Sequence, residues 1–265
     1  MTFTRLLLGL AVLAMSAAPI SGATATPEEK GRSIFESLDA RNSGYGDLQV
    51  DLQMILLSAS GYASERALRV SQIEQPGDGD RMLVVFDTPA DIRGTALLSH
   101  AHKDREDDQW LYLPAIKRVK KVSSHNKSGS FVGSEFSYQD LSPVELEKYT
   151  YRFLRNELCN ELPCYVVERL STESNYQYTK EHFWIDQAAL RVHRVDYFDR
   201  SDQPVKRLVA TDFTLHENQF WKAGRMLMTN LRTAKSTELR WHNFAFNTGL
   251  DSVRDFGVTG LRRAR

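Results

Sequence analysis

The chain has 265 residues, of which 42% are hydrophobic and 26% are charged, so its composition is that of a globular protein able to bury a sizeable core. Lys and Arg number 34 and Asp and Glu also number 34, which gives a formal net charge of zero. This balance excludes a field over the whole molecule that would draw it to nucleic acid or to an anionic membrane, so any electrostatic recognition must be local.

The first 25 residues have the pattern of a cleavable secretory signal. Arg5 precedes a short apolar run, residues 6–15, and small residues follow up to A-T-A at 23–25. The run is too short to span a membrane, and an A-x-A sequence suits cleavage. We expect cleavage after Ala25, with Ala23 as the alternative, and a soluble mature protein in the periplasm. An uncleaved anchor is the other interpretation, whereas the lack of a nearby cysteine disfavours a lipoprotein.

Three segments of four residues begin with Thr or Ser followed by Pro and end with an acidic residue, which is the pattern of a helix start. They are residues 26–29 (TPEE), 88–91 (TPAD) and 142–145 (SPVE). The hydroxyl would cap the helix, Pro would fit its first turn and the acid would face the positive end of its dipole. After the first, Ile34, Phe35 and Leu38 recur at helical spacing, which predicts an amphipathic helix to about Ala40. The other two predicted helices are brief.

Most of the remaining chain alternates between apolar and polar residues, as strands with one wet face do. Residues 48–56 (LQVDLQMIL) are the clearest case, and similar runs lie near 67–74, 81–87, 95–99, 109–113, 149–158, 165–170, 178–185, 190–198, 205–215, 220–231 and 238–246. Short polar turns separate them, and we find no linker or repeat. We therefore expect an antiparallel meander of about a dozen strands, forming one curved sheet in a single domain, residues 26–265.

A curved sheet of this size has an apolar concave face that needs a cover. Three short helices would cover part of it, and whatever remains open would be a cavity for an apolar ligand.

The two cysteines, Cys159 and Cys164, lie in the sequence CNELPC between two predicted strands. In an oxidising compartment, a pair this close across a turn with proline is expected to form a structural disulfide at a hairpin tip. The alternative is a redox-active pair, which normally has the spacing C-x-x-C at a helix start.

The chain contains no motif that indicates catalysis. His100 and His102 would share one face of a strand and could bind a metal, but no third ligand follows at a fixed spacing. There is no H-E-x-x-H, G-x-S-x-G, Walker or G-x-G-x-x-G motif. We therefore expect a protein that is not an enzyme and that has no catalytic residue, no metal site and no cofactor.

Aromatic and basic residues gather between residues 110 and 138. The aromatic set is a candidate wall or lid of a ligand cavity: Trp110, Tyr112, Phe131, Phe136 and Tyr138. The basic set is a candidate polar rim: Lys117, Arg118, Lys120 and Lys121, with His125 and Lys127 nearby. The alternatives are ordinary core aromatics and a solvated hairpin tip. Pro114, which cannot donate to a ladder, is expected to end strand pairing before the basic set.

Three motifs in this order resemble the outer-membrane lipoprotein-sorting-protein-like family, which comprises periplasmic relatives of the lipoprotein carrier LolA. They are FDTPADIRGTALLS (residues 86–99), DDQWLYLPAIKRVKKV (107–122) and FVGSEFSYQDL (131–141). The resemblance extends from about residue 27 to residue 265 and implies a mainly β fold, an unclosed and strongly curved antiparallel β-barrel with short helices on its concave side. It also implies an apolar cavity for acyl chains and an association with lipid-exporting transporters of the inner membrane.

The resulting functional hypothesis is a periplasmic carrier or binding protein for lipid, acyl-chain or lipoprotein cargo. Its partners would be these apolar chains, an inner-membrane lipid transporter and a peripheral membrane surface, with no nucleic acid. A docking subunit of an envelope transporter, with a cavity filled by side chains, is the alternative. A hydrolase of envelope lipids is a third class, for which the sequence offers no nucleophile and base.

Overall fold

The computed structural model describes residues 25–263, so the predicted signal peptide lies outside the described residues except for Ala25. One α-helix precedes the sheet: α1 (Pro27–Asn42). The strands are β1 (Asp47–Leu57), β2 (Ala63–Ile73), β3 (Arg81–Thr88), β4 (Ala96–His100), β5 (Asp108–Leu113), β6 (Arg118–Lys121), β7 (Tyr149–Cys159), β8 (Leu162–Ser171), β9 (Lys180–Asp186), β10 (Val192–Phe198), β11 (Pro204–His216), β12 (Phe220–Asn230) and β13 (Ser236–Phe246). Short 3-10 turns are η1 (Pro114–Ile116), η2 (Ser124–Asn126), η3 (Phe131–Gly133), η4 (Gln139–Leu141), η5 (Leu146–Lys148) and η6 (Val258–Arg263).

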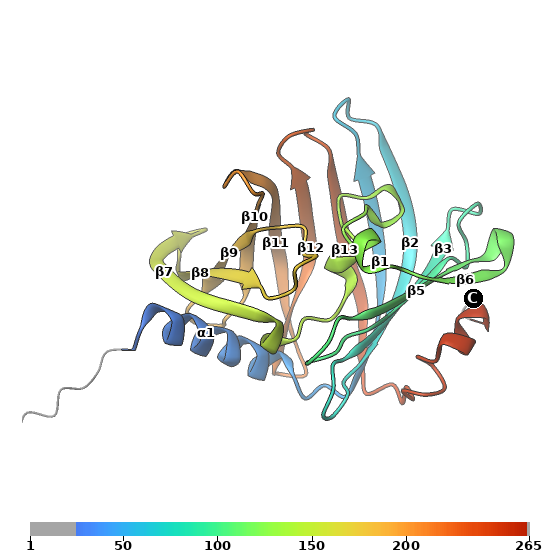
Figure 1. Cartoon of the computed structure of the whole chain (residues 1–265), viewed down its shortest axis with the longest axis horizontal. Coiled ribbons are helices and arrows are strands. Elements are labelled where there is room, and N and C mark those ends of the chain that lie inside the picture. Colours follow the sequence, from blue (N-terminus) through green and yellow to red (C-terminus); the bar gives the residue numbers. More distant parts are fainter. Residues whose placement is uncertain (1–24, 264–265) are drawn as a thin grey trace, which may run out of the picture.

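The strands form one antiparallel sheet in the order β6-β5-β4-β3-β2-β1-β13-β12-β11-β10-β9-β8-β7. Strands β1 to β6 pair in chain order, as do strands β7 to β13, and β1 pairs with β13 to join these two halves of the meander. The sheet curves strongly without closing (Figure 1), so β6 and β7 are its two edges. This architecture confirms the predicted mainly β, unclosed antiparallel fold.

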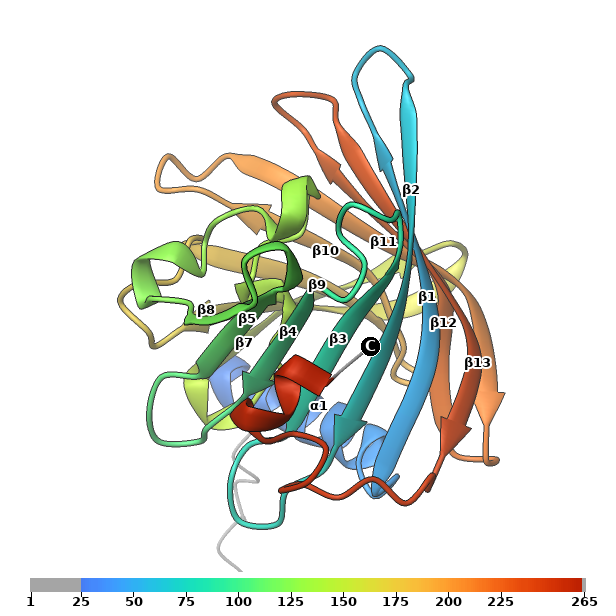
Figure 2. The same cartoon turned by 90° about the vertical axis from the view of Figure 1, so that its right-hand side faces the viewer.

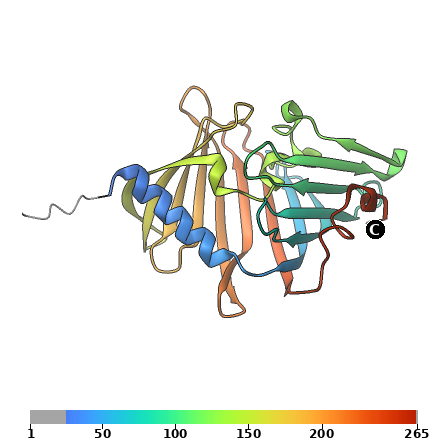
Figure 3. The ribbon, with the colours of Figure 1, turned by 60° about the horizontal axis from the view of Figure 1, so that its bottom comes forward.

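The first predicted helix is confirmed, and it extends two residues beyond the expected end. Thr26 Oγ1 accepts a hydrogen bond from Glu29 N at 3.1 Å, and Glu29 Oε2 accepts one from Thr26 N at 2.8 Å. This reciprocal capping box satisfies backbone donors that the first helical turn cannot. α1 crosses the half of the sheet that contains β7–β12 (Figure 3), with Ile34 and Phe35 buried against it.

The two other predicted helices are wrong. Residues 89–94 form a turn between β3 and β4, because Gly94 N donates to Phe86 O and hairpin pairing takes the backbone groups a helix would need. Thr88 Oγ1 accepts a hydrogen bond from Ala67 N of β2 instead of capping a helix. Ser142 likewise donates to Asp107 Oδ2 at 2.5 Å, and the single turn η5 begins only at residue 146. Tertiary hydrogen bonds outweigh the local helix signal in both places.

The basic stretch is a strand, which corrects the expectation that pairing ends at Pro114. Pro114 begins the turn η1, Lys117 takes a left-handed conformation with φ 51°, and the chain returns as β6 alongside β5. Leu113 pairs with Arg118 and Trp110 with Lys121 in this hairpin. The proline therefore lies in the turn, where it has no ladder bond to lose.

Apolar side chains pack on both faces of the sheet. The main core lies on the concave face, between the sheet and two covers: α1 over β7–β12, and an irregular covering segment, residues 122–148, that contributes Phe131, Phe136 and Leu141. A smaller core lies on the opposite face of β3–β6, where the C-terminal segment supplies Phe256 and Leu261. Figure 2 shows this segment in front of β3 and β4, with α1 behind them.

Cys159 and Cys164 form the predicted disulfide, with their Cα atoms 5.9 Å apart. The bond links the two strands at the tip of the β7–β8 hairpin, next to the sheet edge. A covalent link there opposes fraying of an edge hairpin that has a neighbour on one side alone.

Candidate functional site

An apolar cavity of about 370 Å³ lies between the C-terminal half of α1 and the concave face of β8–β12. Its apolar lining comes from α1, the covering segment and the sheet: Phe35, Leu38, Val144, Leu146, Phe183, Ala189, Leu190, Val192, Ala210, Phe213, Trp221, Ala223 and Met226. Residues lining the end beside the last turn of α1, such as Arg41 and Gln219, are exposed, whereas Phe35 and Phe183 are buried. The cavity therefore opens to solvent near the end of the helix.

The position of α1 depends on a close approach at its first turns. A Cβ atom on Gly31 would lie 2.7 Å from the backbone nitrogen of Phe153 in β7, so a larger residue would push the helix away. One turn later, Phe35 packs on Tyr151 with ring centroids 4.4 Å apart and on Phe183 at 5.1 Å. The helix is thus anchored at its N-terminal half, and the cavity lies under its other half.

The inner end of the cavity contains a buried ion pair. Arg169 Nε donates to Glu181 Oε2 at 2.6 Å, and the guanidinium lies 4.1 Å from the ring centroid of Tyr149. Tyr176 donates to the other carboxylate oxygen of Glu181 at 2.8 Å. Burial would lower the pKa of Arg169, but the charge of Glu181 outweighs it and raises that pKa. The pair is therefore charged and held in place by aromatic rings.

The turn between β9 and β10 forms one side of the cavity and depends on Asp186. The carboxylate accepts hydrogen bonds from Ala189 N at 2.7 Å, from Arg191 Nε at 2.8 Å and from His193 Nε2 at 3.1 Å. Arg191 then lies over the rings of Phe213 and Trp221. Burial would raise the pKa of Asp186, but these hydrogen bonds and ion pairs lower it, so the group is ionised at neutral pH.

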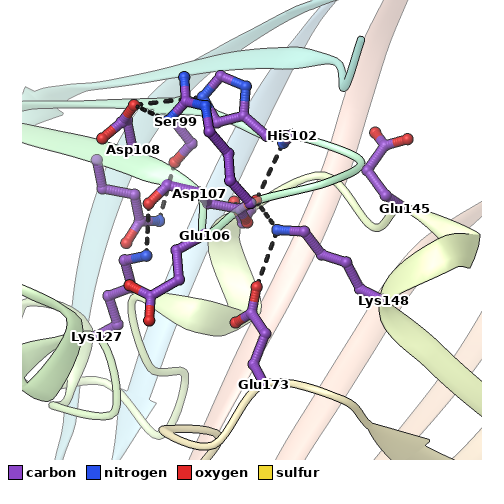
Figure 4. A network of polar contacts seen from close by, with 12 residues as sticks. Ser99, His102, Glu106, Asp107, Asp108, Lys127, Glu145, Lys148 and Glu173 are labelled. Atoms are coloured by element: carbon purple, nitrogen blue, oxygen red, sulfur yellow. Dashed lines mark hydrogen bonds and ion pairs between the residues drawn. The ribbon is translucent and has the colours of Figure 1, made fainter.

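A polar network fastens the covering segment to the β4–β5 connection (Figure 4). Lys148 forms ion pairs with Asp107 and, at 3.0 Å, with Glu173. Lys127 Nζ donates to the backbone oxygen of Asp107 at 2.5 Å, and the side chain of Ser142 donates to the Asp107 carboxylate. Since Lys148 is buried, loss of both carboxylate partners would leave an uncompensated charge in the interior. This network holds the covering segment against the sheet.

The structure separates the five predicted aromatic residues onto the two faces of the sheet. Phe131, Phe136 and Tyr138 belong to the covering segment and pack into the concave core. Trp110 and Tyr112 lie on the opposite face, in the core that the C-terminal segment completes. The five residues therefore do not form one wall, and none of them lines the cavity under α1. Their part in ligand binding stays a prediction.

The predicted basic rim is on the exposed edge of the sheet. Lys117, Arg118, Lys120 and Lys121 are all exposed, and Lys121 Nζ lies 2.6 Å from Asp108 Oδ1. Charged side chains on an edge strand prevent pairing with a second sheet, which is a sufficient reason for their presence.

Tyr112 and Lys117 also border a second, open hollow of about 880 Å³ beside the β5–β6 turn. Half of its lining residues are charged: Asp87, Arg93, Lys117 and Arg262. Such a lining suits water and ions better than an acyl chain.

The two histidines considered as metal ligands have other partners. His100 Nε2 lies 2.8 Å from the backbone oxygen of Phe256, and burial lowers its pKa. His102 lies between Asp78 at 2.9 Å and Asp108 at 3.3 Å. Within residues 25–263, no group of three or more His, Cys, Asp or Glu side chains is arranged to hold a metal ion. In the same part of the chain, no helix is long and apolar enough to cross a membrane.

The charged residues of the cavity were not predicted from the sequence, although a signal for them exists. Arg169 lies two residues after Val167, and Lys222 lies two residues after Phe220, both of which are buried. Since side chains two apart share a face of a strand, each cation occupies a position of the apolar face. A charged residue at such a position indicates that apolar side chains do not pack continuously there.

The curved sheet, its helix and the apolar cavity between them define a protein of the LolA-like fold class. The chain belongs to the outer-membrane lipoprotein-sorting-protein-like family, as its motifs indicated. A family model described as "Uncharacterized protein" matches residues 78–263. The crystal structure of an outer membrane lipoprotein-sorting protein domain from Vibrio parahaemolyticus is 44% identical, with a TM-score of 0.87 over 89% of this chain and 100% of that one.

Two further solved structures are similar. A DUF1329 family protein from Desulfovibrio piger is 26% identical, with a TM-score of 0.84 over 89% of this chain and 100% of that one. A LolA superfamily protein from Nitrosomonas europaea is 18% identical, with a TM-score of 0.68 over 87% of this chain and 97% of that one, and shares the fold. A search of curated proteins found no match.

Proposed function

We propose that the protein is a periplasmic carrier or binding protein for lipid, acyl-chain or lipoprotein cargo, and that it is not an enzyme. The observation that carries the proposal is the apolar cavity between α1 and the concave face of β8–β12. Its volume of about 370 Å³ is within the usual range of small-molecule sites. Each methylene group that enters it would contribute about 0.8 kcal/mol by leaving water. No cofactor is needed for such binding.

The cellular setting rests on the sequence and on the relatives. The first 25 residues have the pattern of a secretory signal, and a disulfide suits an oxidising compartment. The Vibrio relative is described as an outer membrane lipoprotein-sorting protein domain. We therefore propose that the protein takes part in transport to the outer membrane, or acts with an inner-membrane lipid exporter. In either case it would contact a membrane peripherally.

The alternative, a docking subunit with a filled core, would leave no room for an acyl chain. The cavity supports the carrier over this alternative. A hydrolase of envelope lipids would turn over a lipid ester and lose that activity on substitution of one Ser or His.

The test is extraction of lipid from protein purified without detergent, followed by mass spectrometry and by titration with a fluorescent fatty acid. Ala223→Leu, which adds bulk inside the cavity, should weaken uptake. Ala245→Leu, on the exposed side of β13, is the matched control and should bind as the wild type does. Protein that carries no lipid and takes up no fatty acid would refute the carrier.

A further inference from the structure

The lining of the cavity is unequal in charge. It contains four cationic side chains, Arg41, Arg169, Arg191 and Lys222, and one carboxylate, Asp39. An apolar chain cannot compensate these positive charges, so either other groups of the protein or a polar group of the ligand must do so. The partners of each cation decide between these two explanations.

Three of the four cations have partners in the protein. Arg169 is paired with Glu181, and Arg191 with Asp186. Arg41, on the exposed last turn of α1, donates to the backbone oxygen of Ala188 at 3.3 Å. These contacts account for the three arginines as parts of the fold.

Lys222 is different. Within residues 25–263, its ammonium group has no hydrogen-bond or ion-pair partner, and it lies 5.4 Å from the ring centroid of Tyr45 and 5.8 Å from that of Phe220. The carboxylate that acts on it, Glu74, accepts hydrogen bonds from Gly44 N at 2.7 Å and Gly46 N at 2.8 Å instead. Burial lowers the pKa of Lys222, and the charge of Glu74 opposes this without cancelling it.

A partly buried ammonium without an anionic partner destabilises the empty protein, because its lost hydration is not replaced. The two aromatic rings replace a part of it. An anionic group on a bound ligand would compensate the charge of Lys222 more fully. Lys222 lies at the start of β12, close to the exposed end of the cavity marked by Gln219, where the polar end of an amphiphile would remain once its chain is buried.

We propose that the cavity takes a single-chain amphiphile with an anionic oxygen headgroup, carboxylate or phosphate, and that Lys222 binds this headgroup. The volume of about 370 Å³ is near the lower end of the range for ligand sites, which favours one chain over several. The inference rests on the proposed lipid-binding function and specifies its ligand. The apolar chain lies under α1, toward Phe35 and Phe183, and the headgroup stays beside Lys222.

The test compares three probes of equal chain length, dodecanoate, 1-dodecanol and dodecyl phosphate, by displacement of a fluorescent fatty acid from the mature protein. A charge-assisted hydrogen bond corresponds to about 10- to 100-fold in affinity, so at least one of the anions should bind about tenfold more tightly than the alcohol. Tighter binding of dodecanoate assigns a carboxylate headgroup, and tighter binding of dodecyl phosphate assigns a phosphate.

Lys222→Met should remove this preference and leave the affinity for 1-dodecanol within about twofold, while Lys222→Arg should keep it. Lys235→Met, in the exposed β12–β13 turn, is the matched control. Equal binding of alcohol and anions by the wild type would overturn the role of Lys222 and leave the carrier intact. If none of the three probes binds, the carrier itself fails. The wild-type comparison decides the outcome even if Lys222→Met does not fold.

Discussion

The two halves of the concave face have different covers, and the difference determines where a ligand can bind. Over β8–β12, the helix α1 leaves a cavity of about 370 Å³. Under the irregular covering segment, the hollow beside Asp107 and Lys148 measures about 30 Å³, and Phe131 and Phe136 of this segment are buried against the sheet. A straight helix meets a curved sheet along one line, whereas an irregular chain can direct large side chains into the space. We call the half under the covering segment the core, because side chains fill it, and the half between α1 and β8–β12 the container, because it holds the cavity.

The largest expected effect comes from emptying the filled half. Phe131 is fully buried and packs on Phe86 and Tyr138 with ring centroids 5.4 Å and 5.5 Å apart. Phe131→Ala should lower the free energy of unfolding by about 3–5 kcal/mol, measured by urea denaturation. Phe213→Ala, in the wall of the cavity, should cost less than half as much, because that side chain already borders empty space. Equal costs would contradict the distinction between core and container.

Acid should weaken the side of the cavity that depends on Asp186. The pKa of Asp186 is lower in the folded chain than its usual value, because hydrogen bonds from Ala189, Arg191 and His193 outweigh the effect of burial. Asp186 therefore stabilises the fold above its unfolded pKa of about 3.9, and this contribution is lost as the pH falls through the folded value. Urea denaturation between pH 5 and pH 3 should show a decline in stability.

Asp186→Asn should show a smaller decline over the same range, since it has no proton to gain. The wild type should lose more unfolding free energy than the variant, by up to about 1.5–3 kcal/mol, which is the contribution of a hydrogen bond to a charged group. Asp104→Asn, at an exposed position, should follow the wild type. A decline in Asp186→Asn as steep as in the wild type would exclude Asp186 as the cause.

Moving α1 should change the container and leave the core intact. Gly31→Ala would place a Cβ atom 2.7 Å from Phe153 N, so we expect a loss of about 1–3 kcal/mol and weaker uptake of a fluorescent fatty acid. In an unconstrained helix the same substitution would stabilise by up to about 1 kcal/mol, so the sign of the change is diagnostic. Ser33→Ala, on the exposed side of α1, should change neither quantity. A stabilised Gly31→Ala variant would show that α1 does not pack closely on β7.

The smallest effect on stability should come from the basic edge strand. Replacing Lys117, Arg118, Lys120 and Lys121 with Ser should cost less than about 1 kcal/mol, because exposed ion pairs contribute little. Self-association, measured by light scattering, should rise as the edge of β6 becomes free to pair. A loss of lipid uptake would instead support the headgroup rim predicted from the sequence. Loss of partner binding with uptake intact, after charge reversal, would support a docking surface.

Local patterns predicted most of the secondary structure. The Thr-Pro-Glu-Glu sequence predicted α1 correctly, because every contact of its capping box lies within four residues. Apolar and polar alternation predicted twelve of the strands, since side chains two apart share a face of a strand. The same cap pattern failed at Thr88 and Ser142, whose hydroxyl groups form hydrogen bonds with residues from other strands or loops.

The candidate site was harder to predict, because a strand's alternation shows that two faces exist without telling which one is concave. Trp110 and Phe131 are both apolar and close in the chain, yet they pack on opposite faces of the sheet. The cavity is lined by residues from 35 to 226, brought together by curvature and by one helix. No pattern within a window of ten residues carries that information.

The sequence by itself therefore determined the class of fold, the first helix, the run of strands, the disulfide pair and the family. These follow from near-neighbour contacts, residue periodicity and motifs. The tertiary structure alone decided which strands lie under α1 and which aromatic residues fill the core. It also placed Lys222 beside aromatic rings, with no anionic partner among the residues that the structure describes. Such features depend on the curvature of the sheet and on the segments that cover it. Both are set by contacts between distant parts of the chain.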